Sequence, residues 1–446
     1  MIFNKKRFFT LFLMVSLCLI LSCSPKDEVV KDLVSLNQNH TEYIENIDSK
    51  KNYMPWHHQK IIFQNYKRIF FSPWRKTRSN ITKKKIYNEF ERINSKTRFG
   101  ENKVPIDKGW FSKIKQNLDA EKFPNFKKYG ITIANSNLRI LPTQKPIFSG
   151  FTDDSNGFPF DIIQNSTIPA NTPIYISHIS KNKEWVLVES SYAHGWVKIR
   201  DIAYAGPKFR KRFKNHNSFV AVTEDDFPVR TFSGDHLYNG FIGMVFPLLK
   251  ESKRNYHILT AAATTTKYAY SKESVISKAH ARRMPVPLNI ENVSSICGKL
   301  TNKPYGWGGL YNNRDCSAMI KDIYTPFGIW LPRNSTSQAK NGGLFFDLSN
   351  LEAESKEEFI LNNAVPYLTL LWFPGHIMLY IGEKDEDPIV FHNIWGIRTN
   401  DERKRKIIGK SVITTLQPGE GIENADETAD FLERIKAMTL ISPRYY

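Results

Sequence analysis

The sequence predicts a multidomain protein with a mainly helical N-terminal region, two small all-β barrels and a C-terminal α+β domain. The chain has 446 residues, which is more than one hydrophobic core usually holds. Near residue 130 its apolar residues change from helical spacing to short strands, and near residue 285 helices return, followed by strands. An aromatic content of 13% indicates folded domains rather than low-complexity sequence.

The start of the chain predicts export. Three basic residues at positions 5–7 precede an apolar stretch, Phe8 to Leu21, that is shorter than the roughly 20 residues of a spanning helix. The stretch ends in Leu-Ser-Cys at 21–23, which resembles a bacterial lipobox. We therefore predict a lipoprotein signal peptide (1–22), a lipidated Cys23 and a polar tether (23–28). The alternatives are an ordinary secretory signal and an uncleaved anchor. The protein is expected to be an exported bacterial lipoprotein, anchored to a membrane in the periplasm or cell envelope.

The charge of the chain is strongly basic. The formal net charge is +19, and removing the three basic residues of the signal leaves about +16 (19 − 3). Such an excess suits an anionic polymer or a membrane surface. Nucleic acid is not expected as a partner, because no arginine-rich block or nucleic-acid motif occurs. Downstream of the signal no second apolar run is long enough to span a membrane.

Four regions follow the tether. Residues 29–126 show helical patterning. Residues 127–206 hold short strands and turns, and both Asn137–Thr143 and the closing Gly-Trp-Val at 195–197 resemble bacterial SH3-like domains. A second SH3-like barrel is expected over 213–280, with strands at Gly240–Leu249 and Tyr256–Leu259.

The last region, 285–446, is predicted to contain helices and then an antiparallel sheet. A charged stretch, Asp401–Lys410, is expected to be a solvated loop. The expected strands are Tyr367–Trp372, His376–Gly382 and Pro388–Trp395, and a final helix is expected over Thr428–Ala437.

Cys316 lies where turn residues give way to a helical pattern. Gly, Asn and Asp precede it, and five apolar residues follow on one helical face, with Gly328 as a C-terminal cap. Cysteines at helix N-termini can have pKa values of about 3.5–7.5, because the partial positive charge there favours the thiolate. Cys316 is therefore a candidate nucleophile, and a buried structural cysteine is the alternative.

Cys297 is the other cysteine beyond the predicted signal and lipidation site. Apolar positions 290, 293, 296, 297 and 300 repeat at helical spacing, so we expect Cys297 in a helix core. Export makes a disulfide between Cys297 and Cys316 the alternative, and that bond would remove the nucleophile.

Two histidines are candidate partners of Cys316. His376 opens a buried strand after Pro-Gly, and His392 lies on the next strand, so a hairpin would bring both to one end of the sheet. A thiol nucleophile needs a base, and the base needs a group that orients its ring. For either histidine alone, a satisfied core position is the alternative. No metal or other cofactor is expected, since no CxxC, HExxH or carboxylate cluster is present.

At these residues the chain resembles the NlpC-type papain-like cysteine peptidases of bacterial cell walls. It is most similar to γ-D-glutamyl–diamino-acid endopeptidases that carry SH3-like domains before the catalytic domain. One departure is Ala318, where the family usually has Gly. The matching segments are Tyr305-Gly306-Trp307-Gly308-Gly309, Asp315-Cys316-Ser317, Leu331 to Gln338, Gly375-His376 and His392.

The resemblance implies a papain-like fold for the C-terminal domain and a catalytic role for three residues. Cys316 is expected to attack the D-glutamyl side-chain amide, His376 to act as base and then acid, and His392 to orient His376. The backbone N–H of Cys316, with the Tyr305 hydroxyl, is expected to stabilise the oxyanion.

The resemblance also implies substrate contacts. Asp315 and Ser317 are expected to hold the free L-alanine amino group, and Ser335 the D-glutamate carboxylate. Tyr305 and Trp307 are expected to wall the pocket, with Tyr192 reaching it from the first barrel. Each residue also has a plain structural explanation: a helix N-cap for Asp315, a turn for Ser335 and core packing for the aromatic rings.

The expected function is hydrolysis of the γ-D-glutamyl–diamino-acid bond in peptidoglycan stem peptides or muropeptides by a monomer. One alternative is a catalytically inactive wall-binding lipoprotein. Another is an N-acetylmuramoyl-L-alanine amidase or acyltransferase on the same scaffold.

Overall fold

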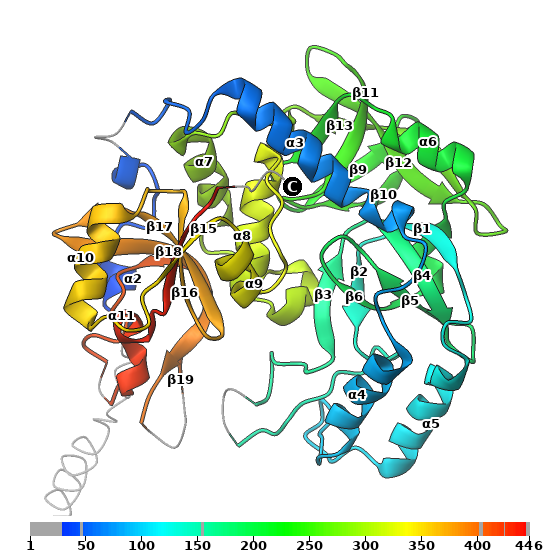
Figure 1. Cartoon of the computed structure of the whole chain (residues 1–446), viewed down its shortest axis with the longest axis horizontal. Helices are drawn as coiled ribbons and strands as arrows, with labels where there is room; N and C mark the ends of the chain where they lie inside the picture. The colour runs from blue at the N-terminus through cyan, green and yellow to red at the C-terminus, as the bar shows by residue number, and fades with distance from the viewer. Residues whose placement is uncertain (1–28, 45–47, 153–155, 401–404, 423, 443–446) are drawn as a thin grey trace, which may run out of the picture.

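The computed structural model describes residues 29–44, 48–152, 156–400, 405–422 and 424–442. The predicted signal peptide (1–22), the lipidation site Cys23 and the tether lie outside these ranges. None of the helices within them is long and apolar enough to cross a membrane. Figure 1 shows the α+β domain on the left and the two barrels on the right.

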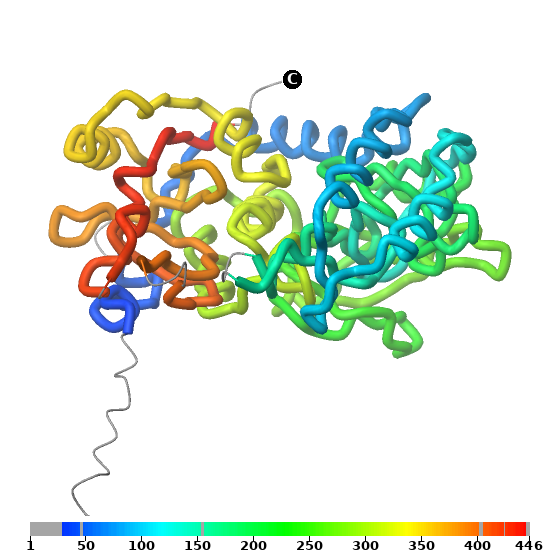
Figure 2. Tube along the Cα trace, turned by 90° about the horizontal axis from the view of Figure 1, so that it is seen from below, coloured from blue at the N-terminus to red at the C-terminus, as the bar shows by residue number. Residues whose placement is uncertain are grey.

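The N-terminal region is helical, as the sequence predicts, and it spans the whole molecule. Helix α3 packs Ile62 into the core of the C-terminal domain and Phe63 into the core beneath the second barrel. Figure 2 shows this segment running along the top of the molecule from one side to the other. The helices are α2 (Asp32–Ser35), α3 (Trp56–Phe70), α4 (Lys83–Asn94) and α5 (Lys108–Leu118).

The first SH3-like domain is a seven-stranded antiparallel sheet with the order β3-β2-β6-β5-β4-β1-β7. Its strands are short and alternate with turns, and they bury an aliphatic core that includes Leu138, Ile174 and Val197. The strands are β1 (Lys128–Thr132), β2 (Ser136–Arg139), β3 (Gln164–Ile168), β4 (Pro173–Ile179), β5 (Trp185–Glu189), β6 (His194–Lys198) and β7 (Ile202–Tyr204).

The second SH3-like domain repeats this architecture after a short basic helix, with the order β10-β9-β13-β12-β11-β8-β14. Its sheet reaches Arg283, three residues past the expected end at 280. The single strand expected over Gly240–Leu249 is wrong, because a turn with Gly243 at φ +93° separates two strands. The elements are α6 (Pro207–Lys214), β8 (Phe219–Val222), β9 (Phe227–Thr231), β10 (His236–Gly240), β11 (Val245–Glu251), β12 (Asn255–Ala263), β13 (Ala269–Ser277) and β14 (Ala281–Arg283).

The C-terminal domain is an α+β unit built on a six-stranded antiparallel sheet with the order β15-β20-β16-β17-β18-β19. Helices α7 and α8 cover one face and α10 and α11 the other, so each face has its own core. The helices are α7 (Ile290–Leu300), α8 (Cys316–Tyr324), α9 (Ser335–Asn341), α10 (Ala353–Asn363) and α11 (Phe431–Arg434). The strands are β15 (Leu344–Asp347), β16 (Thr369–Phe373), β17 (His376–Lys384), β18 (Asp387–Arg398), β19 (Arg405–Thr414) and β20 (Ala437–Leu440).

Two sequence predictions for this domain are wrong. The expected solvated loop 401–410 is strand β19 from Arg405 onward, because charged side chains are compatible with pairing at the edge of a sheet. The helix expected over Thr428–Ala437 is much shorter. The Asp430 carboxylate accepts the N–H groups of Leu432 and Glu433 and starts a new short helix, and Ala437 already belongs to β20.

Candidate active site

Cys316 is the first residue of α8. The Asp315 carboxylate caps this helix by accepting the N–H of Ala318 at 2.8 Å. The apolar face read from the sequence is buried, and Gly328 adopts the left-handed conformation (φ 74°) just past the following 3-10 turn. The thiol side chain therefore sits at the N-terminal end of a fully packed helix, and Cys316 is 8% exposed.

The expectation that the helix start alone favours a thiolate is wrong for this closed site. Burial and the nearby Asp315 carboxylate raise the pKa of the Cys316 thiol to about 12. The backbone N–H groups of Ile377 and Ser317 and the Arg333 charge lower that pKa, but burial outweighs them. Cys316 is consequently a thiol at neutral pH and needs a base before it can attack.

The two histidines form a hydrogen-bonded pair, as the hairpin predicts. Strands β17 and β18 pair antiparallel, and Nε2 of His376 lies 2.8 Å from Nδ1 of His392. His392 is completely buried, whereas His376 at the start of β17 is partly exposed. Burial lowers the pKa of His376 to about 3 and that of His392 well below its usual range, so both rings are neutral at pH 7.

The nucleophile helix meets this pair at the beginning of β17. The thiol of Cys316 faces the backbone N–H of Ile377, the residue next to His376. No hydrogen bond joins the Cys316 sulfur to the His376 ring, and such bonds are commonly long before substrate binds. The fold thus brings the predicted triad to one place, with the histidine pair made and the thiol contact still open.

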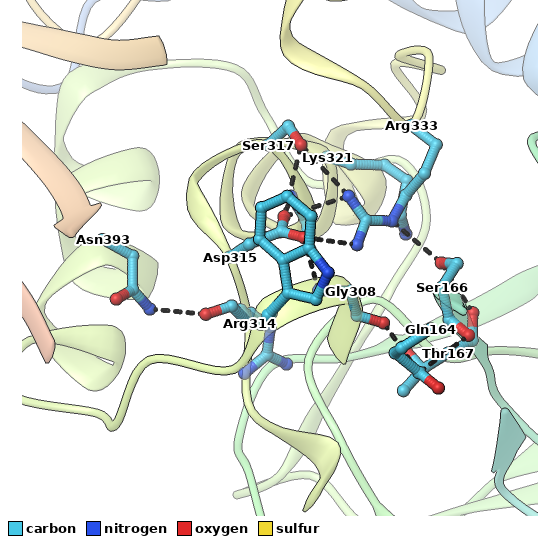
Figure 3. A network of polar contacts seen from close by, with 12 residues as sticks. Gln164, Ser166, Thr167, Gly308, Arg314, Asp315, Ser317, Lys321, Arg333 and Asn393 are labelled. Atoms are coloured by element: carbon cyan, nitrogen blue, oxygen red, sulfur yellow. Dashed lines mark hydrogen bonds and ion pairs between the residues drawn. The ribbon is translucent and has the colours of Figure 1, made fainter. Parts of the chain in front are cut away.

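Arg333 organises the surroundings of Cys316. Its Nη1 and Nη2 donate to Oδ1 and Oδ2 of Asp315 at 2.9 and 2.7 Å, and Nη1 also donates to Ser317 at 3.0 Å (Figure 3). Its Nε donates to the Ser166 hydroxyl of β3 at 2.8 Å, so this residue also joins the two domains. Arg333 was not among the predicted site residues, although it lies in the matched segment Leu331 to Gln338.

This network changes what Asp315 and Ser317 can offer a ligand. Asp315 also accepts the backbone N–H of Gly308 and the hydroxyl of Ser317, and its side chain is 11% exposed. All its strong acceptor positions are therefore occupied within the protein. A substrate ammonium at this carboxylate must share it with Arg333.

The aromatic residues of the matched motif belong to a larger ring cluster, and Tyr305 lies near the thiol. Burial and the nearby Asp315 carboxylate raise the pKa of Tyr305 well above the usual value, and ionisation of Cys316 would raise it further. Trp307 is 38% exposed, and its Nε1 donates to the carbonyl of Asp161 at 3.1 Å. Two rings missed by the sequence analysis complete the cluster: Phe160 packs on Trp307 with centroids 5.2 Å apart, and Trp395 lies 5.9 Å from Tyr305.

The loop between Tyr305 and Cys316 docks onto strand β3 of the first SH3-like domain. Gln164 donates to the Gly308 carbonyl at 3.0 Å (Figure 3). Gly308 and Gly309 have φ values of +57° and +87°, and a Cβ at Gly309 would stand 2.6 Å from the Thr167 side chain. Glycine is therefore required for both the backbone conformation and the close approach of the two domains.

Tyr192 and Ser335 lie further from the thiol contacts. The Tyr192 hydroxyl donates to the Thr167 carbonyl at 3.1 Å, and its ring lies 5.0 Å from the Lys321 ammonium, one helical turn beyond Ser317. Tyr192 lines a 40 Å³ cavity together with Ala318 and Arg333. Ser335 begins α9 and is partly exposed, directly after the N-cap Asn334. Their roles toward substrate stay predictions.

Both described cysteines are free, so the disulfide alternative is not realised in this structure. Cys297 is completely buried in α7, as predicted for a core residue. Within the described ranges, no group of three or more His, Cys, Asp or Glu side chains is placed to hold a metal ion.

Comparisons with known proteins match four consecutive parts of the chain. The model described as the N-terminal NLPC_P60 stabilising domain matches residues 8–123, and the NlpC/P60 family model matches residues 302–404. Between them, an SH3 domain of SH3b1 type matches residues 146–198 and one of SH3b2 type matches 208–253. A search of curated proteins found no match.

A solved structure supports the same arrangement. The protein described as a novel NlpC/P60 endopeptidase from Photobacterium damselae subsp. piscicida has a TM-score of 0.81 at 23% identity, covering 92% of this chain and 98% of its own. An NlpC/P60 family protein from Bacillus cereus ATCC 10987 is less similar, with a TM-score of 0.43 at 18% identity (63% of this chain, 83% of its own). With its four matched parts in this order, the chain carries an NlpC/P60 family domain, preceded by a stabilising N-terminal region and two SH3 domains.

Proposed function

We propose that this protein is a cysteine endopeptidase that hydrolyses the γ-D-glutamyl–diamino-acid bond of peptidoglycan stem peptides. The observation that carries the proposal is the arrangement of Cys316 at the start of α8 against the hydrogen-bonded pair His376–His392. A nucleophile, a base and an orienting group are the three parts that covalent acyl transfer needs.

The chemistry starts from a neutral pair, because the thiol pKa is raised and the His376 pKa is lowered. His376 Nε2 is bonded to His392, so its Nδ1 is the nitrogen left to take the thiol proton. The sulfur then attacks the amide carbon, and His376 returns the proton to the departing amino group of the diamino acid. Water, deprotonated by His376, hydrolyses the resulting γ-glutamyl thioester and frees Cys316.

The developing oxyanion is assigned to two donors. The N–H of Cys316 is free at the helix N-terminus, and the Tyr305 hydroxyl stays protonated because its pKa is raised. Oxygen acceptors that gain charge in the transition state bind such fixed donors more tightly than the ground-state carbonyl does.

Substrate selection is assigned to the rim of the same site. Asp315 and Ser317 hold the free L-alanine amino group, Ser335 the D-glutamate carboxylate, and Tyr305 and Trp307 wall the pocket. Tyr192 contributes from the first SH3 domain. Because Arg333 already pairs with Asp315, the substrate ammonium shares this carboxylate with the guanidinium.

The predicted export signal supports an activity at the cell envelope. Lipidation at Cys23 would tether the enzyme to a membrane, and a net charge of about +16 (19 − 3) without the signal favours the anionic envelope. The SH3 domains support a peptidoglycan substrate.

The test is incubation of the protein with L-Ala-γ-D-Glu-diamino-acid peptides, followed by mass spectrometry of the products. Release of L-Ala-D-Glu is expected from the wild type and from Cys297→Ala, which removes the other described thiol, but not from Cys316→Ala. An inactive wild type would contradict the proposal and favour a wall-binding lipoprotein. Cleavage at the muramoyl–alanine bond would instead assign an amidase.

A second substrate pair tests the amine contact. The same peptide with an acetylated alanine amine is expected to lose most of its kcat/KM, because an ammonium can pair with Asp315 and an amide cannot. Equal turnover of both peptides would show that Asp315 only pairs with Arg333 and caps α8, and does not bind the substrate amine.

A further inference from the structure

A buried polar chain continues beyond His392. Nε2 of His392 lies 3.0 Å from Oγ1 of Thr414, and that hydroxyl donates to the carbonyl of Thr415 at 2.7 Å. His392 on β18 and Thr414 on β19 are diagonal neighbours on one face of the sheet, and both are completely buried. Thr414 lies outside the segment 302–404 that matches the NlpC/P60 model, so the match to that model gives Thr414 no functional role.

The hydrogen-bonding capacity of each group fixes where the protons are. A carbonyl only accepts, and two oxygens 2.7 Å apart without a proton between them repel, so the single Thr414 proton points at Thr415. The Thr414 oxygen is then an acceptor for His392 Nε2–H. A neutral imidazole carries one N–H, so His392 Nδ1 is bare and accepts Nε2–H of His376. This leaves Nδ1 of His376 as the basic nitrogen.

The far end of the chain is held by the N-terminal region. The Asp32 carboxylate accepts both the backbone N–H and the hydroxyl of Thr415 at 2.9 Å, and Asp32 is 5% exposed. Gln38 of the N-terminal region binds the backbone of Ile413, the residue before Thr414 in β19. Its side chain accepts the N–H of Ile413 at 2.8 Å and donates to the Ile413 carbonyl at 3.0 Å. The Thr415 carbonyl that orients Thr414 is therefore fixed by residues almost 400 positions earlier in the chain.

We propose that Thr414 is a positioning residue that sets the tautomers of His392 and His376, so that Nδ1 of His376 is the base for Cys316. This proposal rests on the proposed cysteine-peptidase function for its catalytic consequence, but the proton arrangement itself does not. Without the hydroxyl, a buried His392 Nε2–H has no acceptor, and the ring gains by moving its proton to Nδ1. The proton on His392 Nδ1 then faces Nε2 of His376, so His376 must move its own proton from Nε2 to Nδ1. A proton on Nδ1 of His376 prevents this nitrogen from acting as the base.

The test compares wild type, Thr414→Val and Thr414→Ser by ¹⁵N NMR of histidine side chains. Thr439→Val is the matched control, because Thr439 is equally buried in the same sheet and its hydroxyl also donates to a carbonyl, that of Ala339 at 2.7 Å. We expect the Nε2–H tautomer of His392 in wild type, Thr414→Ser and Thr439→Val, and the Nδ1–H tautomer in Thr414→Val. His392 in the Nδ1–H form in wild type overturns the proposal, even if Thr414→Val does not fold.

Kinetics give the second readout. A general base contributes roughly 10²–10⁴-fold, so Thr414→Val should lower kcat about 10- to 100-fold with little change in KM, and Thr414→Ser should restore it. If kcat in Thr414→Val equals that of Thr439→Val, the positioning role is overturned. If the wild type has no peptidase activity, the proposed function fails, while the tautomers still decide the role of Thr414.

Discussion

The guanidinium of Arg333 holds the carboxylate of Asp315 by two parallel hydrogen bonds of 2.9 and 2.7 Å. The two residues are 9% and 8% exposed. Because Asp315 caps the nucleophile helix and Arg333 also reaches Ser166, this ion pair ties the start of α8 to the first SH3 domain. The geometry around Cys316 therefore depends on a contact between two domains.

Replacing Arg333 should expose this dependence. Removing one partner of a buried ion pair costs about 3–5 kcal/mol, so Arg333→Met should strongly lower the midpoint of denaturant unfolding. Arg333→Lys keeps the charge but cannot make both the paired contact with Asp315 and the contact with Ser166. Its unfolding midpoint should therefore lie between those of the wild type and Arg333→Met. Arg200→Met is the control, since the Arg200 side chain is 72% exposed. Equal midpoints for Arg333→Met and Arg200→Met would show that the pair adds no stability.

Gly309 of the motif loop should not tolerate replacement by alanine. Alanine there must adopt φ +87° and would meet Thr167, so Gly309→Ala should destabilise the protein by more than about 2 kcal/mol and reduce activity. Gly298→Ala is the matched control. Gly298 lies at an exposed position of helix α7 and a Cβ there meets nothing, so alanine should be neutral or stabilising by about 1 kcal/mol. Thermal unfolding of both variants decides the matter, and a harmless Gly309→Ala would contradict the tight docking.

Acid should destabilise the fold through its buried histidines. Burial lowers the pKa of His40 and that of His376 to about 3 and that of His392 well below its usual range, whereas an unfolded histidine titrates near 6.5. Between pH 6.5 and 3 the unfolded chain therefore binds more protons, and stability falls as the pH drops. Three such groups give a slope of about 4 kcal/mol per pH unit.

Urea unfolding between pH 7 and 4.5 measures this slope. His40 sits against the Tyr367 hydroxyl and the Phe391 ring, so His40→Phe should remove about a third of the slope. His57→Phe, at an exposed position, should leave the slope as in the wild type. An unchanged slope in His40→Phe would mean that His40 is not the group that resists protonation.

Alkylation should report the raised thiol pKa. With a pKa of about 12, the thiolate fraction of Cys316 is small at pH 7 and grows about tenfold per pH unit up to pH 10. Iodoacetamide labelling, followed by mass spectrometry of the peptide containing Cys316, should show this rise in His376→Ala as well as in the wild type. A rate that is already on a plateau near pH 7 would indicate a preformed thiolate–imidazolium pair.

Local sequence patterns predict much of the candidate active site. The turn residues before Cys316 and the helical apolar face after it fix the start of α8, since an N-cap and a buried face act within one or two turns. The hairpin that pairs His376 with His392 follows from two adjacent apolar strands. The charged strand β19 was missed because the pairing of an edge strand leaves little hydrophobic signal.

Local sequence patterns are sufficient to place the start of the helix and of the strands, because these depend on neighbours in the chain. The protonation states and the support of the site depend instead on tertiary contacts. The pKa of Cys316, the pairing of Arg333 with Asp315 and the chain from His376 to Asp32 arise from burial and from contacts between segments up to 383 residues apart, and no local pattern records them.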